Sequence, residues 1–362
     1  MQKQALLTLA DGTSFQGFST SEDGFSVGEV IFNTAQTGYQ EILTDPSYAQ
    51  QIIVFTNPHI GNVGVNIDDQ ESSKIHACGM VTRSLSPISS NWRAEEHLST
   101  WLTKHKTPSI AGINTRALTL HLRKTGSQAG CIMVGNVDPQ IAKNHAVNFA
   151  GISNENLSEK VSTKNSYEIN PDHAQHHVVV YDFGVKQSII QSLLNQQCKI
   201  TVVPGHTSVE SVLALDPNGI VFSNGPGDPT KCIEAIENAK ILFTKNIPLL
   251  GICLGHQILA LAQGAQIEKM TFGHHGANHP IRCLKSGDIF ISSQNHGFVV
   301  SEKNFPHSLE ITHQSLFDQT IAGFSHKTLP IIAFQGHPES SPGPTELKIV
   351  FEQFKKLIST TR

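Results

Sequence analysis

Residues 177–264 alternate short, unbroken apolar stretches with amphipathic ones, and this alternation constrains the fold more than any other feature of the sequence. Apolar runs that are continuous rather than alternating are typical of strands buried on both faces, and intervening helices allow such strands to run parallel. The sequence therefore predicts an α/β fold here, a mostly parallel sheet flanked by helices. The expected strands are 177–184, 199–204, 219–224 and 247–253, and the expected helices are 185–196, 232–246 and 256–264.

The chain of 362 residues is longer than a usual single domain, so two domains are expected. The stretch "STKNSYEINPDHAQH", residues 162–176, is polar and has no apolar periodicity, which is typical of a linker. We expect a first domain over 1–165, a linker over 166–176 and a second domain over 177–362. In the second domain, residues 277–336 are expected to form mostly antiparallel hairpins before a final amphipathic helix.

The first domain has a less regular pattern, for which an α+β fold is expected. A hairpin is predicted around Asp11-Gly12, because this pair favours a tight turn between two strands. Further strands are expected at 51–57 and 130–136, and short helices at 94–105 and 115–126.

Composition excludes several classes of function. The formal net charge of −4 gives no electrostatic reason to expect nucleic acid or a membrane surface as a partner. No apolar run approaches the ~20 residues that span a bilayer, and the first residues do not resemble a signal peptide. The six cysteines are scattered without a C-x-x-C pair, which favours reduced thiols in a cytoplasm and argues against a disulfide scaffold or a cysteine-rich zinc site. Neither common nucleotide-binding fingerprint is present.

The stretch "GICLG", residues 251–255, places Cys253 where a buried strand ends and a helix begins. Glycines on both sides allow a sharp turn, as in the G-x-S-x-G nucleophile elbow. Such a turn exposes the sulfur at the carboxyl end of the sheet, and the helix N-terminus favours the reactive thiolate. The alternative is a buried structural cysteine.

A thiol nucleophile needs a base, and the base needs a group that orients it. In "FQGHPE", His337 follows an apolar stretch, and Pro338 biases it toward an extended conformation. Residues i and i+2 of an extended chain point the same way, so Glu339 can orient the imidazole. A third piece, "FSNGPGDP" at 222–229, has glycines that allow backbone N–H groups to face an oxyanion, although it could also be an ordinary tight loop.

Together, "GICLGHQ", "SNGPGDP" and "GHPE" resemble the class I (triad) glutamine amidotransferases in order and approximate spacing. The resemblance implies glutamine hydrolysis through a γ-glutamyl thioester, with release of ammonia. Cys253 resembles the nucleophile, His337 the general base and acid, and Glu339 its orienter. The backbone N–H of Leu254 is expected to stabilise the oxyanion.

The other half of the chain resembles one branch of these enzymes. "GEVIFNTAQTGYQEILTDPSY" and "PHIGNVGVN" are similar to the N-terminal domain of carbamoyl-phosphate synthetase small subunits, and "FGHHGANHP", "SQNHGF" and "HPESSPGP" continue the resemblance. It implies a glutamine site, whose expected residues are Ser47, Gly225, Gly227, Leu254, Gln257, Asn295, Gly297 and Phe298. Only the resemblance points to Ser47.

The same resemblance implies a partner, the large subunit of carbamoyl-phosphate synthetase. That subunit would receive the ammonia through a tunnel and make carbamoyl phosphate from bicarbonate and ATP, for arginine and pyrimidine synthesis. ATP and Mg or Mn are expected there, and no cofactor is expected on this chain. The first domain would serve docking and the tunnel, in a heterodimer or a higher assembly of heterodimers, and glutaminase activity would be low without the partner.

Three alternatives remain at this point. Another amidotransferase would share the triad but not region 1–165. A non-catalytic scaffold on the same fold would be expected to lack one triad residue. A metal site at His274, His275 and His279 fits no standard zinc spacing. Cys232 is expected to be a packing residue.

Overall fold

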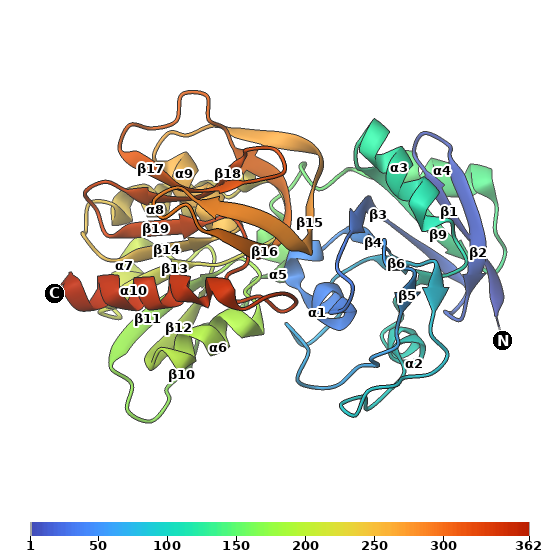
Figure 1. Ribbon diagram of the computed structural model, residues 1–362, viewed down its shortest axis with the longest axis horizontal. Coiled ribbons are helices and arrows are strands. Elements are labelled where there is room, and N and C mark those ends of the chain that lie inside the picture. Colours follow the sequence, from blue (N-terminus) through green and yellow to red (C-terminus); the bar gives the residue numbers. More distant parts are fainter. Residues whose placement is uncertain (1, 362) are drawn as a thin grey trace. The chain divides into compact units, whose positions relative to one another are not determined.

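The computed structural model describes residues 2–361, which form two compact units. The first unit comprises residues 2–154 together with Thr271–Gly276, and the second comprises Glu155–Met270 together with residues 277–361. Each unit contains its own sheet (Figure 1). Each also has its own apolar core.

The second unit is built on a sheet with the strand order β10-β12-β11-β13-β14-β19-β18-β17-β15-β16. Its centre is parallel, as the alternation of apolar and amphipathic stretches predicts. The parallel strands are β11 (His176–Asp182), β12 (Cys198–Pro204), β13 (Gly219–Phe222), β14 (Leu249–Ile252) and β19 (Ile331–Phe334). The carboxyl ends of β13, β14 and β19 therefore lie next to one another.

Helices cover both faces of this parallel region. Alternate residues of the central strands separate into two cores, with Val178 and Val180 in one and Val179 and Tyr181 in the other. The first face packs against α6 (Gln187–Asn195) and α10 (Ile349–Thr360). The second packs against α7 (Val209–Leu213), α8 (Ile233–Leu242) and α9 (Leu254–Ala262). Burial on both faces explains why these strands are continuously apolar.

The remainder of this sheet is antiparallel, as expected for residues 277–336. Strands β17 (Leu309–Ser315) and β18 (Ile321–His326) form a hairpin, and β18 pairs with β19. Two long strands, β15 (Ile267–Cys283) and β16 (Ile289–Val300), lie at the edge. The unit also contains α5 (Leu157–Val161) and the short 3-10 turns η2 (Pro229–Lys231) and η3 (Glu346–Lys348).

The segment predicted as a linker contains a strand of this sheet. Strand β10 (Tyr167–Ile169) pairs antiparallel with β12 at the sheet edge. The residues of β10 are mostly exposed, so its polar composition resembles that of a connecting segment. An edge strand that buries little surface leaves no apolar periodicity in the sequence.

The first unit contains a mixed sheet with the strand order β2-β1-β9-β3-β4-β6-β8. The predicted hairpin around Asp11-Gly12 joins its first two strands. Its strands are β1 (Lys3–Leu9), β2 (Ser14–Ser19), β3 (Gly24–Asn33), β4 (Gln51–Phe55), β6 (Gly79–Val81), β8 (Ser109–Ile110) and β9 (Gln128–Val134). β3, β4, β6 and β8 run parallel, and β1, β2 and β9 pair antiparallel.

Helices also cover both faces of the first sheet. Leu118 and Leu122 of α3 (Thr115–Thr125) pack into the main core, and Ala142 and Ala146 of α4 (Pro139–Val147) pack into a smaller one. Phe272, from the middle of β15, packs against the main core. The remaining elements are α1 (Tyr39–Thr44), η1 (Pro46–Tyr48), α2 (Leu98–Lys104), β5 (His59–Ile60) and β7 (Ser84–Leu85).

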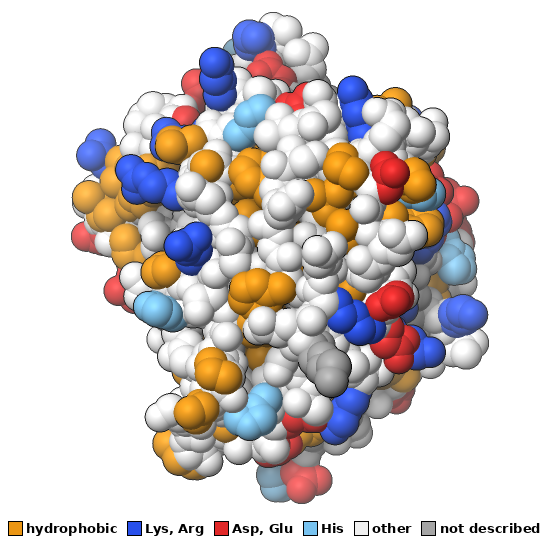
Figure 2. Space-filling model, turned by 90° about the vertical axis from the view of Figure 1, so that its right-hand side faces the viewer, with side chains coloured by type: hydrophobic (Ala, Val, Ile, Leu, Met, Phe, Trp, Pro, Cys, Tyr) orange, Lys and Arg blue, Asp and Glu red, His pale blue; other side chains and the backbone are white. Residues whose placement is uncertain are grey.

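The surface is mixed in character. On the face shown in Figure 2, basic and acidic side chains are interspersed among hydrophobic ones. Among residues 2–361, no helix is both long enough and apolar enough to cross a membrane.

Candidate active site

The cysteine elbow has the geometry that its sequence predicts. β14 ends at Ile252 and α9 begins at Leu254, with Cys253 between them at φ 53° and ψ −103°. A positive φ is costly for a side chain with a Cβ and persists only when the surroundings impose it. One constraint is Gly255, where an added Cβ would lie 2.0 Å from the Phe222 carbonyl oxygen. The close approach of α9 to β13 therefore requires a glycine and helps to hold Cys253 in its strained turn.

The Cys253 thiol is buried and has polar neighbours. Its Sγ donates to the carbonyl oxygen of Asn295 at 3.5 Å, and its side chain interacts with His337. The residue as a whole is 2% exposed. The backbone N–H of Cys253 donates to the carbonyl oxygen of Phe334, so the elbow is fixed to the end of the neighbouring strand β19.

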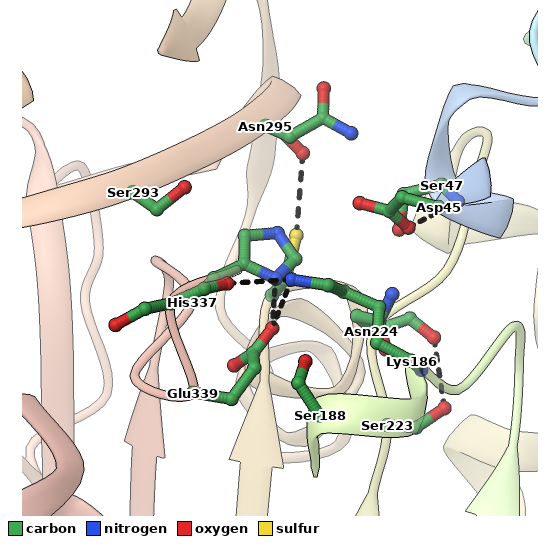
Figure 3. Close-up of polar contacts among 12 residues, drawn as sticks. Asp45, Ser47, Lys186, Ser188, Ser223, Asn224, Ser293, Asn295, His337 and Glu339 are labelled. Carbon is green, nitrogen blue, oxygen red and sulfur yellow. Dashed lines mark hydrogen bonds and ion pairs between the residues drawn. The ribbon is translucent and has the colours of Figure 1, made fainter. Parts of the chain in front are cut away.

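His337 and Glu339 lie just beyond that strand and pair as expected, but through a turn rather than an extended chain, because the N–H of Ser340 donates to the His337 carbonyl oxygen. His337 Nδ1 is 2.7 Å from Glu339 Oε1 (Figure 3), which leaves Nε2 as the ring nitrogen available for proton transfer. Both side chains are buried. The backbone N–H of His337 donates to Ser293 on β16 at 2.9 Å, which fixes the backbone that carries the imidazole.

Lys186 is a buried charged residue of this site that the sequence analysis did not identify. Its Nζ donates to Glu339 Oε1 at 2.9 Å and to the Ser340 carbonyl oxygen at 2.7 Å (Figure 3). Its side chain is 2% exposed. A lone lysine after a strand matches no catalytic motif, so only its position in the fold reveals that it neutralises Glu339.

The neighbouring charges shift the pKa of His337 and the pKa of Glu339 in opposite directions. Burial alone would lower the pKa of His337, but Glu339 and Cys253 outweigh burial and raise it to about 10. Burial alone would raise the pKa of Glu339, but Lys186 and His337 outweigh it and hold the pKa below its usual range. The structure thus favours a carboxylate beside an imidazolium, a state in which the histidine can donate a proton.

The glycine-rich loop lies beside α9, where the sequence places it. The N–H of Gly255 donates to the Ser223 carbonyl oxygen, and the N–H of Lys186 donates to Asn224 Oδ1. A Cβ at Gly225 would lie 2.2 Å from the Phe183 carbonyl oxygen, so this position also requires a glycine. Gly227, two residues further on, has a φ of 91°.

The expected glutamine-site residues of β16 lie next to α9. Gln257 Nε2 donates to the Phe298 carbonyl oxygen at 2.7 Å, and Asn295 accepts from the Cys253 thiol. Asn295 and Phe298 are buried. A Cβ added at Gly297 would meet nothing within 4 Å, so this glycine borders open space.

Leu254 and Ser47 complete the set. Leu254 is the first residue of α9, so its N–H is one of those at the helix start that have no partner within the helix. Ser47 belongs to the first unit, where its N–H donates to Asp45 Oδ1 within η1 at 2.8 Å. Ser47 is 7% exposed.

The residues set aside in the sequence analysis lie in packed positions. Cys232 is buried, and burial raises the pKa of its thiol to about 11, so it is held as a neutral thiol. Its Sγ contacts Ser158 and Asn156, each at 3.6 Å. His274, His275 and His279 are buried, and within residues 2–361 no group of three or more potential ligands has metal-binding geometry.

A strained cysteine at a strand–helix elbow, next to a buried histidine–glutamate pair, places the second unit among the class I glutamine amidotransferases. The family model for glutamine amidotransferase class I matches residues 179–357. The model for the carbamoyl-phosphate synthase small chain, CPSase domain, matches residues 7–132.

Relatives match along the whole chain. The carbamoyl phosphate synthase small chain of Vibrio cholerae is 51% identical over 100% of both chains. The small chain of Vibrio parahaemolyticus is 50% identical over 99% of both chains. The small chain of Ralstonia nicotianae is 49% identical over 97% of this chain and 96% of its own length. The chain belongs to the carbamoyl phosphate synthase small chain family and is the glutaminase half of a glutamine-hydrolysing synthase.

Proposed function

We propose that this chain hydrolyses glutamine through a γ-glutamyl thioester on Cys253. The observation that carries the proposal is the buried arrangement of the elbow thiol, His337 and Glu339, with Lys186 as an added positive charge. A scaffold would gain nothing from a strained cysteine and an interior set of charges, since both are costly to fold.

In the first half of the reaction, the Cys253 thiolate attacks the side-chain carbonyl carbon of glutamine. A C–S bond forms, and the carbonyl electrons move onto oxygen, where the N–H of Leu254 and the loop of Gly225 and Gly227 are the proposed donors. His337 then gives its proton to the leaving nitrogen, and ammonia departs as the carbonyl reforms. Glu339 holds the imidazole through Nδ1 throughout.

In the second half, water attacks the thioester. His337, now neutral, takes a proton from water as the new C–O bond forms, and the C–S bond breaks to return the electron pair to sulfur. Glutamate leaves, and the thiolate and imidazolium are restored. Both halves use the same acid–base pair, and the second proton of water is released when the new γ-carboxyl group of glutamate ionises.

We propose that glutamine contacts Ser47, Gly225, Gly227, Leu254, Gln257, Asn295, Gly297 and Phe298. Support comes from the second unit, where the seven residues other than Ser47 lie on the glycine-rich loop, on α9 and on β16 around the elbow. Ser47 is included because of the resemblance alone.

The ammonia is proposed to pass to a large subunit, which makes carbamoyl phosphate from bicarbonate and ATP with Mg or Mn for arginine and pyrimidine synthesis. Support comes from the relatives, which are named as small chains. We propose that the two subunits form a heterodimer, or a higher assembly of heterodimers, in the cytoplasm. The first domain would serve docking and form the tunnel. We propose no cofactor on this chain and no nucleic-acid or membrane partner. The net charge of −4 and the interspersed surface charges support the last point (Figure 2).

The test is glutamate release by the purified chain, alone and with the large subunit, ATP and bicarbonate. We expect slow release alone, faster release in the complex, and loss of about a thousandfold or more in Cys253→Ser, as for removal of a nucleophile elsewhere. Cys232→Ser is the matched control, another buried thiol that should retain activity. Equal release by wild type and Cys253→Ser would contradict the proposal.

A further inference from the structure

Gln335 presents a buried amide to Cys253, and the triad chemistry above does not use it. Gln335 follows β19 directly and is 1% exposed. Its Nε2 lies 3.9 Å from Cys253 Sγ, within hydrogen-bonding distance of a sulfur acceptor. His337 comes two residues later, and its side chain also interacts with Cys253.

A second hydrogen bond determines which end of the amide faces the sulfur. Gln257 Nε2 donates to Gln335 Oε1 at 3.0 Å and to the Phe298 carbonyl oxygen at 2.7 Å. Because a side-chain amide has one acceptor oxygen and one NH₂ donor, the donor from Gln257 takes the oxygen of Gln335. The NH₂ group of Gln335 is therefore the end that faces Cys253.

The backbone holds this contact on two neighbouring strands. Ile252 of β14 is the register partner of Phe334 of β19, and the N–H of Cys253 donates to Phe334 at 2.9 Å. The N–H of Gln335 donates to Ala322 of β18, also at 2.9 Å. The amide and the sulfur thus come from adjacent strand ends, and their separation is set by the sheet.

A second histidine, His256, lies near the contact between Gln335 and Cys253, and its ring is uncharged at neutral pH. His256 is completely buried on α9 and packs on Phe324 with ring centroids 4.8 Å apart. Burial lowers the pKa of His256 to about 3, against a smaller opposing effect of Gln335. The charged partner of the sulfur is therefore His337, and Gln335 is its neutral donor. A hydrogen bond to an anion in such an interior is stronger than one in water.

We propose that Gln335 is a positioning residue for glutamine hydrolysis, whose side-chain N–H donates to the Cys253 thiolate. The inference rests on the proposed function, because it assumes that the thiolate is the reacting group. The donor holds the sulfur in one orientation for attack. It assists again when water cleaves the thioester, because the electron pair of the breaking C–S bond returns to sulfur.

The test is Gln335→Met, which keeps the length of the side chain and removes its N–H donors. Alkylation of Cys253 by iodoacetamide, followed by mass spectrometry of the Cys253 peptide, should slow about tenfold near pH 6, and the difference from wild type should become smaller as the pH is raised. The kcat for glutamate release should fall about tenfold, with KM within about twofold of wild type.

Gln40→Met is the matched control. Gln40 is also a buried glutamine with both ends of its amide bonded, to the backbone of Asn66 in the first unit. It should leave both alkylation profiles and kcat unchanged. An alkylation profile for Gln335→Met that matches wild type at every pH would overturn the inference.

A second variant covers the case in which Gln335→Met does not fold. Gln335→Glu keeps the shape and an acceptor for Gln257 but places an anion at the sulfur, so it should slow alkylation near pH 6 more than Met does. Failure of both variants to fold would assign Gln335 a structural role and overturn the inference. If wild type itself shows no Cys253-dependent glutamate release, the proposed function fails, and alkylation still reports on the Gln335 contact.

Discussion

Both units contain parallel strands, but the carboxyl ends of those strands carry different residues. In the second unit, β14 is followed by Cys253 and β19 by Gln335 and His337, with Glu339 and Lys186 alongside. In the first unit, β3 ends at Asn33, and β4 and β6 are followed by Thr56 and Thr82. A parallel sheet therefore provides a suitable edge without providing a site, and the difference lies in the buried ionisable groups.

A buried ion pair of the second unit contrasts with an exposed ion pair of the first. Lys186 and Glu339 have side chains that are 2% and 0% exposed, whereas those of Lys3 and Asp23 in the first unit are 39% and 69% exposed. Burying a pair of charges costs desolvation energy that their attraction only partly recovers. The comparison indicates that the second unit keeps its interior charges for chemistry rather than for stability.

The largest effect on stability is expected for Lys186→Met. Removing the ammonium leaves Glu339 buried without its main positive neighbour, which should lower the free energy of unfolding by about 3–5 kcal/mol. Urea unfolding at neutral pH measures the change. The double variant Lys186→Met/Glu339→Gln should recover part of the loss, because it removes both charges. A loss under about 1 kcal/mol in the single variant would remove the contrast between the two units.

A smaller effect on stability is expected from His337, and this effect should change with pH. Its pKa is raised from 6.5 to about 10 in the folded chain, so its contribution to stability is fully present below pH 6.5 and is lost as the pH rises toward about 10. The groups that set this shift are Glu339 and Cys253. The stability advantage of wild type over His337→Asn should therefore shrink over this range in urea unfolding at several pH values. An advantage that stays constant with pH would contradict the charged state described for the site.

The smallest effect is expected for Lys3→Met in the first unit. Because both partners of the Lys3–Asp23 pair are largely exposed, water screens their attraction, and the change should be below about 1 kcal/mol. The same urea measurement serves as the comparison for Lys186→Met, and glutamate release should be unchanged. A loss as large as that of Lys186→Met would show that burial does not distinguish the two pairs.

The sequence predicted the parts of the fold that leave a periodic pattern. The buried parallel strands and amphipathic helices of the second unit were expected from apolar runs, and the Asp11-Gly12 hairpin from its turn residues. The edge strand β10 was not expected, since an exposed strand of three residues leaves no such pattern. The domain limits at 165 and 177 remain predictions.

Within the site, motifs identified residues whose neighbours in sequence constrain them. Cys253 is recognisable because glycines surround it, and His337 and Glu339 because they stand two residues apart after an apolar stretch, although a turn and not an extended chain brings them together. Lys186 and Gln335 depend on contacts between segments far apart in the chain, such as Lys186 with Glu339 and Gln335 with Gln257. One sequence contains no signal for such contacts.

The most direct test of the account is to trap the intermediate. Wild-type chain mixed with glutamine and quenched in acid should carry one glutamyl group on the Cys253 peptide, detected by mass spectrometry, and Cys253→Ser should carry no labile thioester. A wild-type adduct that survives the acid quench and disappears on treatment with hydroxylamine would establish the thioester. Rapid glutamate release without any adduct at Cys253, or with the adduct on another cysteine, would contradict it.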